Sequence, residues 1–151
     1  MLDRSLVVAR APLRISFVGG GTDVLSYATR FGGDAVVCAI DCYVWLSLYP
    51  KCFGGGCVAK FHGYEEVADP VQLHDEFARA VLVGRVGASG AQVASFSDVP
   101  AGTGLGGSAA FTVALLAALD GAVDDRVELA RRASEIEITG LARAVGRNVM
   151  W

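Results

Sequence analysis

The spacing and type of the apolar residues predict that the β-strands of this chain lie within its first hundred residues. Residues 6–9 and 14–18 are short aliphatic and β-branched runs with Pro12 between them, which predicts two strands. Residues 35–49 form a longer run that predicts one bent strand or two, with Asp41 either on a solvated face or at a bend. Further short strands are expected at residues 58–62, 64–68 and 92–96.

Four other segments are expected to be helical. The expected helices cover residues 24–31, 71–86, 108–119 and 124–139. Thr22 and Asp23 are both suited to cap the first of these helices, and Asp124 is suited to cap the last. Strands and helices do not alternate regularly, which favours an α+β domain over a doubly wound sheet.

Composition excludes several classes of protein. Of the 151 residues, 53% are hydrophobic and 19% are charged, which excludes a disordered chain and predicts one compact domain or one piece of a larger one. The net charge of −3 is too small, and of the wrong sign, for nucleic acid or an anionic membrane as the main partner. Residues 99–119 are uncharged, but glycines fill the first half of this stretch. The helical remainder is shorter than the roughly 20 residues that span a bilayer, so we expect no membrane segment here.

Four cysteines lie close together in the sequence, at positions 38, 42, 52 and 57. Their C-x3-C and C-x4-C spacings differ from the C-x2-C spacing that is typical of zinc sites. Disulfides are typical of secreted proteins, but the apolar run at residues 6–9 is too short for the core of a secretory signal. We therefore expect reduced cysteines that act as small apolar residues in a cytoplasmic protein, with a cysteine-based metal module as the alternative.

The strongest chemical signal is the segment PAGTGLGGSAA at residues 100–110, between an expected strand and an expected helix. Its glycines allow close approach of a ligand to the backbone, and the N–H groups of the loop and helix start suit a phosphate. Ser108 could cap this helix or bind a metal. The loop lacks the lysine of a P-loop and the βαβ context of a dinucleotide site, and the alternative is a flexible loop into a core helix. The candidate binding residues are Pro100, Gly102, Thr103, Gly104, Leu105, Gly106, Gly107, Ser108 and Ala109.

A second glycine motif, APLRISFVGGGTD, occupies residues 11–23. Its three consecutive glycines give close backbone access to a ligand. Asp23 can accept hydrogen bonds from sugar hydroxyls, and Arg14 can bind phosphate or carboxylate in a fork. The alternative interpretation is a glycine turn with Asp23 as a helix cap.

The last expected helix carries a carboxylate on its apolar face. Glu137 lies in the middle of that face, whereas Glu135 lies on the opposite, charged face. A carboxylate buried without a partner is costly, so Glu137 should be paired, hydrogen-bonded or bound to a cation. The alternative is a glutamate that reaches solvent at the helix end. The apolar face consists of Val127, Leu129, Ala130, Ala133, Ile136 and Leu141.

Together these motifs resemble those of the GHMP kinases, the superfamily of galactokinase, homoserine kinase, mevalonate kinase and phosphomevalonate kinase. Residues 100–110 resemble the second family motif, and residues 11–23 resemble the first in the form found in heptose 7-phosphate kinases. The motifs have the family's order and separation, and the resemblance extends to about Gly146, the first half of a typical member. It implies an α+β N-terminal domain with the ribosomal-protein-like left-handed βαβ crossover.

The resemblance also implies an activity, namely ATP- and Mg²⁺-dependent phosphoryl transfer to a sugar hydroxyl. The anomeric oxygen of a heptose 7-phosphate is the acceptor that the first motif suggests. The resemblance implies that residues 100–109 hold the nucleotide phosphates and that Arg14 is the catalytic residue near the transferred phosphoryl group. It further implies that Ser108 and Glu137 bind Mg²⁺. Substrate contacts are implied for Gly20, Gly21, Thr22 and Asp23.

The chain departs from the family pattern at two places. Gly107 stands where relatives usually carry a serine, and Val149 stands where they carry the aspartate that acts as the base. We therefore expect an ATP-binding N-terminal domain at residues 1–146 and a divergent terminus at residues 147–151, with the C-terminal domain absent. A separately encoded C-terminal half or self-association could complete such a kinase. The alternative is a non-catalytic fragment or pseudokinase that at most binds nucleotide.

Overall fold

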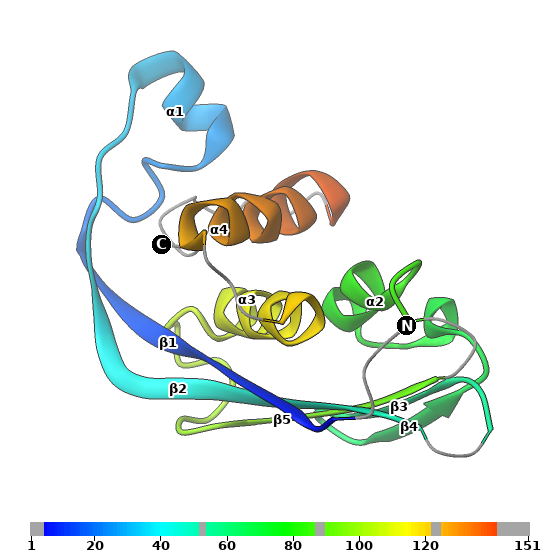
Figure 1. Ribbon diagram of the computed structural model, residues 1–151. Helices are drawn as coiled ribbons and strands as arrows, with labels where there is room; N and C mark the ends of the chain where they lie inside the picture. The colour runs from blue at the N-terminus through cyan, green and yellow to red at the C-terminus, as the bar shows by residue number, and fades with distance from the viewer. Residues whose placement is uncertain (1–4, 52–53, 87–89, 122–124, 142–151) are drawn as a thin grey trace.

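The computed structural model of the chain describes residues 5–51, 54–86, 90–121 and 125–141. The fold is a five-stranded sheet with helices over one face (Figure 1). The strands are β1 (Val7–Val18), β2 (Val36–Pro50), β3 (Cys57–Lys60), β4 (Tyr64–Val67) and β5 (Ala91–Ser97). The helices are α1 (Leu25–Phe31), α2 (Glu76–Leu82), α3 (Gly107–Asp120) and α4 (Arg126–Glu135), with a 3-10 turn η1 (Pro70–Gln72) and a π-helical turn η2 (Ile136–Gly140). The predicted α+β class is confirmed.

The strands follow the order β1-β2-β5-β3-β4 across the sheet. Neighbouring strands are antiparallel except β3 and β5, which are parallel. The chain therefore crosses from β3 to β5 through β4, η1 and α2. Helices α2 and α3 lie side by side over the sheet, and α4 packs on α3 on the side away from the sheet (Figure 1).

The prediction of two N-terminal strands is wrong, because β1 runs unbroken through Pro12. As an edge strand, β1 pairs only with β2, and an edge tolerates a residue that has no N–H to donate. The pairing register shifts between Pro12 and Arg14. On β2 this irregularity spans the exposed Asp41, so the long apolar run forms one bent strand with Asp41 at the bend.

Two of the expected helices begin later than predicted, each at an aspartate that caps it. The expected helix over residues 71–86 is divided into η1 and α2, and Asp75 caps α2 by accepting from the N–H of Ala78 at 2.8 Å. Asp125, rather than Asp124, caps α4 by accepting from two backbone N–H groups at 2.9 and 3.0 Å. Asp124 itself lies outside the described residues.

Helix α3 forms the centre of the core because most of its side chains are apolar and many of them are small. Its buried alanines and leucines pack against β1 and β2, and α4 covers its other side. On α4 the predicted apolar face is buried at Leu129, Ala130 and Ala133, but Val127, in the first turn, is exposed. The core therefore holds α3 between the sheet and α4. No helix in the described ranges has the length and apolar character that crossing a membrane requires.

Candidate functional site

The glycine loop joins the end of β5 to the first residue of α3, as the sequence predicts. Gly104 and Gly106 have φ angles of +75° and +80°, in the left-handed region that favours glycine. A Cβ on Gly104 would meet no atom within 4 Å, so this side of the loop is open. Gly106 is the N-cap of α3 and has no side chain to accept from the first N–H groups of the helix. These N–H groups are oriented as a helix N-terminus that suits an anion.

Hydrogen bonds from Arg14 connect β1 to this loop. Its backbone N–H donates to the carbonyl of Leu105 at 3.0 Å, and its Nη1 donates to the carbonyl of Gly104 at 3.3 Å. The aliphatic part of the side chain lies against Gly106, where a Cβ would stand 3.3 Å from Arg14 Cγ. The loop therefore has a guanidinium fixed along one side.

The Nε atom of Arg14 is buried and has no hydrogen-bond partner among the described residues. An unpaired buried donor carries a desolvation cost of roughly 1–3 kcal/mol, more when the group is charged. Arg14 lines a cavity of about 700 Å³ at the loop, so a ligand there would lie beside a guanidinium whose Nε has no acceptor among the described residues. This donor is the feature of the site that the fold alone leaves unexplained.

The cavity gathers most of the residues that the sequence singled out. Leu105 is not part of its lining but packs on the core and presents its carbonyl to Arg14. Predicted site residues that line the cavity are Arg14, Pro100, Gly102, Thr103, Gly104, Gly106, Gly107, Ser108, Ala109 and Glu137.

Glu137 reaches this cavity from η2, and its side chain is only 2% exposed. Its Oε1 lies 3.1 Å from the hydroxyl of Thr112 in α3. Burial raises the pKa of the Glu137 carboxyl, and the hydrogen bond from Thr112 opposes this increase. A nearby cation would favour the charged form.

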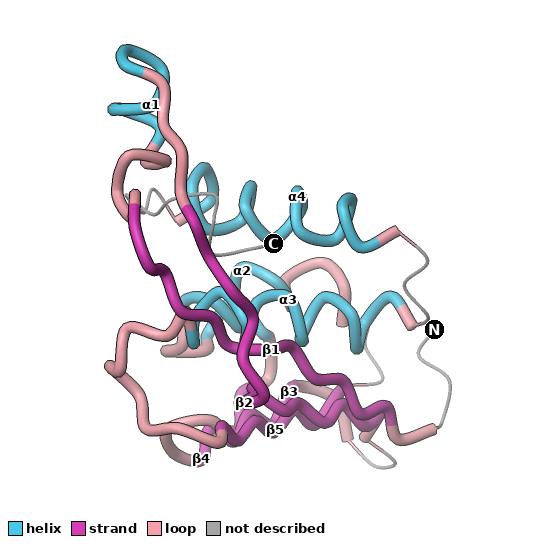
Figure 2. The backbone as a smooth tube through the Cα atoms, turned by 90° about the vertical axis from the view of Figure 1, so that its left-hand side faces the viewer, coloured by secondary structure: helices cyan, strands magenta, loops and turns pink. Residues whose placement is uncertain are grey.

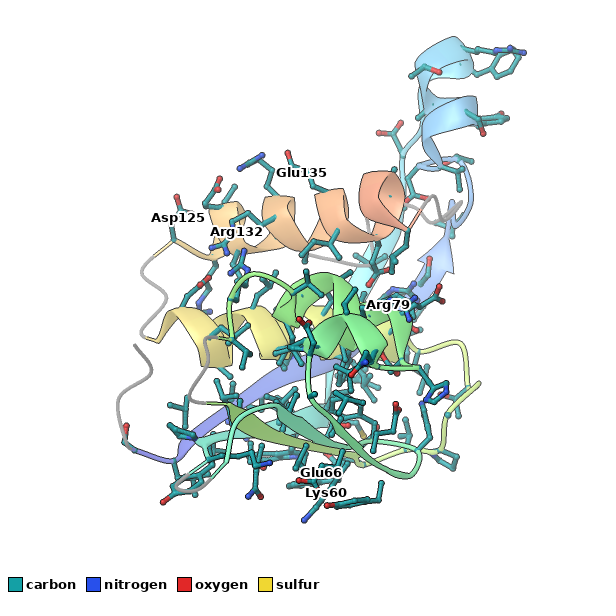
Figure 3. All side chains as sticks on the ribbon, turned by 90° about the vertical axis from the view of Figure 1, so that its right-hand side faces the viewer. Lys60, Glu66, Arg79, Asp125, Arg132 and Glu135 are labelled. Atoms are coloured by element: carbon teal, nitrogen blue, oxygen red, sulfur yellow. The ribbon has the colours of Figure 1, made fainter. Side chains whose placement is uncertain are left out.

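Glu135 behaves as the helical periodicity predicts for the opposite face. It is exposed, forms an ion pair with Arg131 and points away from α3 in Figure 3. The two glutamates differ in environment although they are only two residues apart, because the helix turns one toward the cavity and the other toward solvent.

The first motif forms its own turn between β1 and α1, and its four predicted substrate residues do not line the cavity. The hydroxyl of Thr22 lies 2.7 Å from the carbonyl oxygen of Gly19 and 3.0 Å from that of Asp34. Asp23 Oδ1 accepts from the N–H of Gly21 at 3.2 Å. The expected capping of α1 by Thr22 or Asp23 is wrong, because the N-cap is Val24 and makes no side-chain bond. The other two predicted residues, Gly20 and Gly21, belong to the same turn.

Sequence reasoning missed the apolar part of the cavity. Phe61 and Phe111 lie there with ring centroids 5.0 Å apart in an edge-to-face arrangement, and Phe77 and Val99 join them. These residues come from separate elements and share no motif, so only the general preference of apolar residues for the interior points to them. Thr112 was missed too, because it interrupts an otherwise apolar helix by a single hydroxyl.

The cysteines do not assemble a metal site in the part of the chain that the structure describes. Cys38 is exposed, Cys42 is half-buried and Cys57 is buried, and all three are free thiols. Cys52 lies outside the described residues. Burial raises the pKa of the Cys57 thiol, and nearby Lys51 opposes the shift. Within the described ranges, no group of three or more His, Cys, Asp or Glu side chains could hold a metal ion. A metal bound by a single glutamate would therefore need further oxygen ligands, such as those of a bound phosphate or of water.

Several solved structures share the fold. A D-glycero-D-manno-heptose 1-phosphate kinase from Bacteriodes thetaiotaomicron superposes with a TM-score of 0.81 at 25% identity, covering 94% of this chain and 51% of its own. A putative sugar kinase from Campylobacter jejuni gives 0.77 at 23% identity, covering 99% and 52%. Lactococcus lactis galactokinase complexed with galactose gives 0.75 at 17% identity, covering 97% and 41%. The chain thus spans about half the length of these relatives, or less.

Comparison at the level of sequence gives a consistent result. A search of curated proteins found no match. The model of the GHMP kinases N terminal domain matches residues 72–149, slightly more than half of the chain, including the glycine loop, α3, α4 and Glu137. The chain belongs to the GHMP kinase family, of which it carries the N-terminal domain.

Proposed function

We propose that this chain binds Mg-ATP at residues 100–109 and serves as the nucleotide-binding part of a small-molecule kinase. The observation that carries the proposal is the unpaired, buried Nε of Arg14, fixed beside the open glycine loop on the cavity. Loop N–H groups, a helix N-terminus and a guanidinium are three complementary donors for phosphate oxygens. No acidic residue of the loop opposes them.

The oxygen-bearing side chains that line the cavity fit the magnesium ion of Mg-ATP. Magnesium prefers oxygen ligands and is usually held by one or two carboxylates together with substrate phosphates. Glu137 and the hydroxyl of Ser108 line the same cavity and would supply the protein oxygens. When bound, Mg²⁺ neutralises charge on the phosphates during transfer. The apolar region formed by Phe61, Phe77 and Phe111 is suited to the nucleobase.

Each remaining residue has a proposed part in the reaction. Arg14 donates to the transferred phosphoryl group and stabilises charge that develops there. Asp23, with Gly20, Gly21 and Thr22, binds the hydroxyls of the acceptor. We propose a heptose 7-phosphate as that acceptor, phosphorylated at its anomeric oxygen. The first motif resembles that of heptose kinases, and the structure at 25% identity is that of a D-glycero-D-manno-heptose 1-phosphate kinase.

Calorimetric titration of Mg-ATP into Gly104→Val tests the nucleotide site. The valine side chain would enter the open space of the loop where we place a phosphate, so binding should be lost. Gly84→Val is the matched control, because Gly84 has φ +76° against +75° for Gly104, equally open surroundings and no place in the cavity. Equal affinity in the two variants would exclude the loop as the site.

A second candidate function, nucleotide binding without catalysis, is favoured by Val149, which lies outside the described residues. A valine cannot accept a proton, and a general base typically contributes ~10²–10⁴ in rate. We expect little ADP release from the chain alone with heptose 7-phosphate, galactose, fucose or mevalonate. Turnover near 1 s⁻¹, within the range of about 1–100 s⁻¹ for competent kinases, would contradict this expectation. In that case the acceptor giving the highest rate would identify the substrate class.

A further inference from the structure

Thr112 is an unusual residue in the centre of α3. Among the described residues, Thr112 and Glu137 are the two buried side chains that are polar or charged, with exposed fractions of 0% and 2%. The other buried residues of α3 are alanines and leucines. A valine would occupy almost the same volume as Thr112 without a hydroxyl that needs a partner. The hydroxyl therefore calls for an explanation.

The hydroxyl connects the start of α3 with η2. Thr112 Oγ1 lies 3.1 Å from the carbonyl oxygen of Ser108, one turn earlier, and 3.1 Å from Glu137 Oε1. Threonine commonly bonds the carbonyl four residues earlier in a helix, and that bond alone would satisfy the group. A single hydroxyl proton cannot be donated to both oxygens at once. The helix itself therefore accounts for the bond to the carbonyl of Ser108 but not for the contact with Glu137.

Glu137 depends on this contact more than Thr112 does. Among the described residues, the hydroxyl of Thr112 lies within hydrogen-bond distance of one carboxylate oxygen of Glu137, Oε1. The contact joins α3 to a π-helical turn, and such turns occur frequently at functional sites. One carboxylate oxygen is thus committed to the protein, while the residue lines the cavity.

We propose that Thr112 is a positioning residue, which holds the Glu137 carboxylate in the orientation in which its second oxygen can bind the cation that accompanies the nucleotide. The proposal rests on the proposed function, because it assumes that Glu137 and Ser108 contribute to a Mg²⁺ site. Groups that orient a metal-binding carboxylate typically change metal affinity by about 10–100-fold when they are removed. Thr112 acts through Glu137 and does not itself line the cavity.

The test compares Thr112→Val, which removes the hydroxyl at nearly constant volume, with Thr112→Ser, which keeps it. ATP affinity is measured by calorimetry on the full chain, once with Mg²⁺ and once with EDTA. We expect Thr112→Val to reduce the gain in ATP affinity that Mg²⁺ provides by about 10–100-fold and to leave the affinity in EDTA unchanged. Thr112→Ser should retain most of the gain. If Thr112→Val does not fold, Thr112→Ala against Thr112→Ser gives the same comparison without the β-branched carbon.

Two results would overturn the proposal while leaving the Mg-ATP site intact. Thr112→Val could keep the full Mg²⁺ gain of the wild type, or it could weaken binding equally with Mg²⁺ and with EDTA, as a purely structural role requires. Failure of the proposed function looks different, because it appears in the wild type. A wild-type chain that binds no ATP, or gains nothing from Mg²⁺, refutes that function and the inference with it.

Discussion

At the residue scale, the site depends on two charged side chains that the fold directs to one cavity from opposite ends of the sequence. Arg14 reaches the cavity from β1, and Glu137 reaches it from η2. Helical periodicity places Glu137 correctly, because a carboxylate in the middle of an apolar face is easily recognised. The family resemblance implies that Arg14 lies near the phosphates, but no sequence pattern predicts its hydrogen bond to the carbonyl of Gly104, 90 positions away. Such a contact requires the sheet to be assembled first.

The substitution Arg14→Lys should distinguish binding of the terminal phosphate of ATP by Arg14 from structural support of the glycine loop by Arg14. Lysine keeps the charge but loses the Nε donor and the planar fork. A hydrogen bond to a charged group contributes about 1.5–3 kcal/mol, so ATP affinity should fall about tenfold or more. ADP affinity, which lacks the terminal phosphate, should change much less. Calorimetry with both nucleotides checks this, and an equal loss for ATP and ADP would show that Arg14 only supports the loop.

The raised pKa of Glu137 predicts how stability depends on pH in the absence of divalent cations. Burial favours the neutral carboxyl, so the folded state holds its proton to a higher pH than the unfolded state. The stabilising contribution of this group is complete below its ordinary pKa of 4.5 and is lost as pH rises through the raised value. Urea unfolding of wild type and Glu137→Gln from pH 4 to 8 should show the wild type losing stability relative to the variant.

Glu135→Gln is the control for this pH series. Glu135 lies on the exposed face and pairs with Arg131, so its substitution should produce no comparable trend toward neutral pH. If the differences between wild type and the two variants follow the same pH dependence, Glu137 is not the buried carboxyl that the structure describes.

At the element scale, sequence patterns predict the elements well and their limits poorly. The glycine loop, α3 and the strands at residues 57–67 and 91–97 lie close to where apolar runs and glycines place them. The errors have local causes. Pro12 breaks no strand because β1 is at an edge, and Asp75 starts α2 later than the apolar spacing suggests. The π-helical turn after α4 has no sequence signal, since its residues continue the helical pattern.

The start of α4 gives a prediction about stability at this scale. Asp125 Oδ1 accepts from the N–H groups of Val127 and Glu128 and so satisfies two donors at the helix N-terminus. Asp125→Ala should lower the free energy of unfolding by about 1 kcal/mol, whereas Asp125→Asn should cost much less because asparagine caps equally well. Urea unfolding measures both. Equal losses in alanine and asparagine variants would indicate that the charge rather than the cap stabilises α4.

At the scale of the whole molecule, residues 15–40 form an arm that extends beyond the layered body. The distal ends of β1 and β2 carry α1 away from the other helices (Figure 2). This arm exposes several large apolar side chains, including Phe17 at 68% and Phe31 at 73%. Phe31 also contacts Tyr27, with ring centroids 5.0 Å apart. Contiguous exposed apolar groups mark interaction surfaces, so we predict that the arm mediates self-association of the chain.

The double variant Phe17→Ser with Phe31→Ser tests the arm. If the arm mediates self-association, sedimentation velocity over a concentration series should show oligomers for the wild type and monomers for the double variant. Tyr64→Ser is the control, because Tyr64 is a similarly exposed aromatic residue on β4, at the far edge of the sheet from β1. Self-association that persists in the double variant would exclude the arm as the surface responsible.

The central claim is that the backbone N–H groups of the glycine loop and the start of α3 bind the phosphates of Mg-ATP. Amide hydrogen exchange of the full chain, measured with and without Mg-ATP, tests this claim most directly because it reports on those N–H groups themselves. We predict that Mg-ATP slows exchange across residues 102–110 and in the segment around Arg14, while residues 24–33, at the distal end of the arm, change little. Binding of Mg-ATP with unchanged exchange at residues 102–110, or with protection confined to another segment, would contradict the assignment of the loop as the phosphate site.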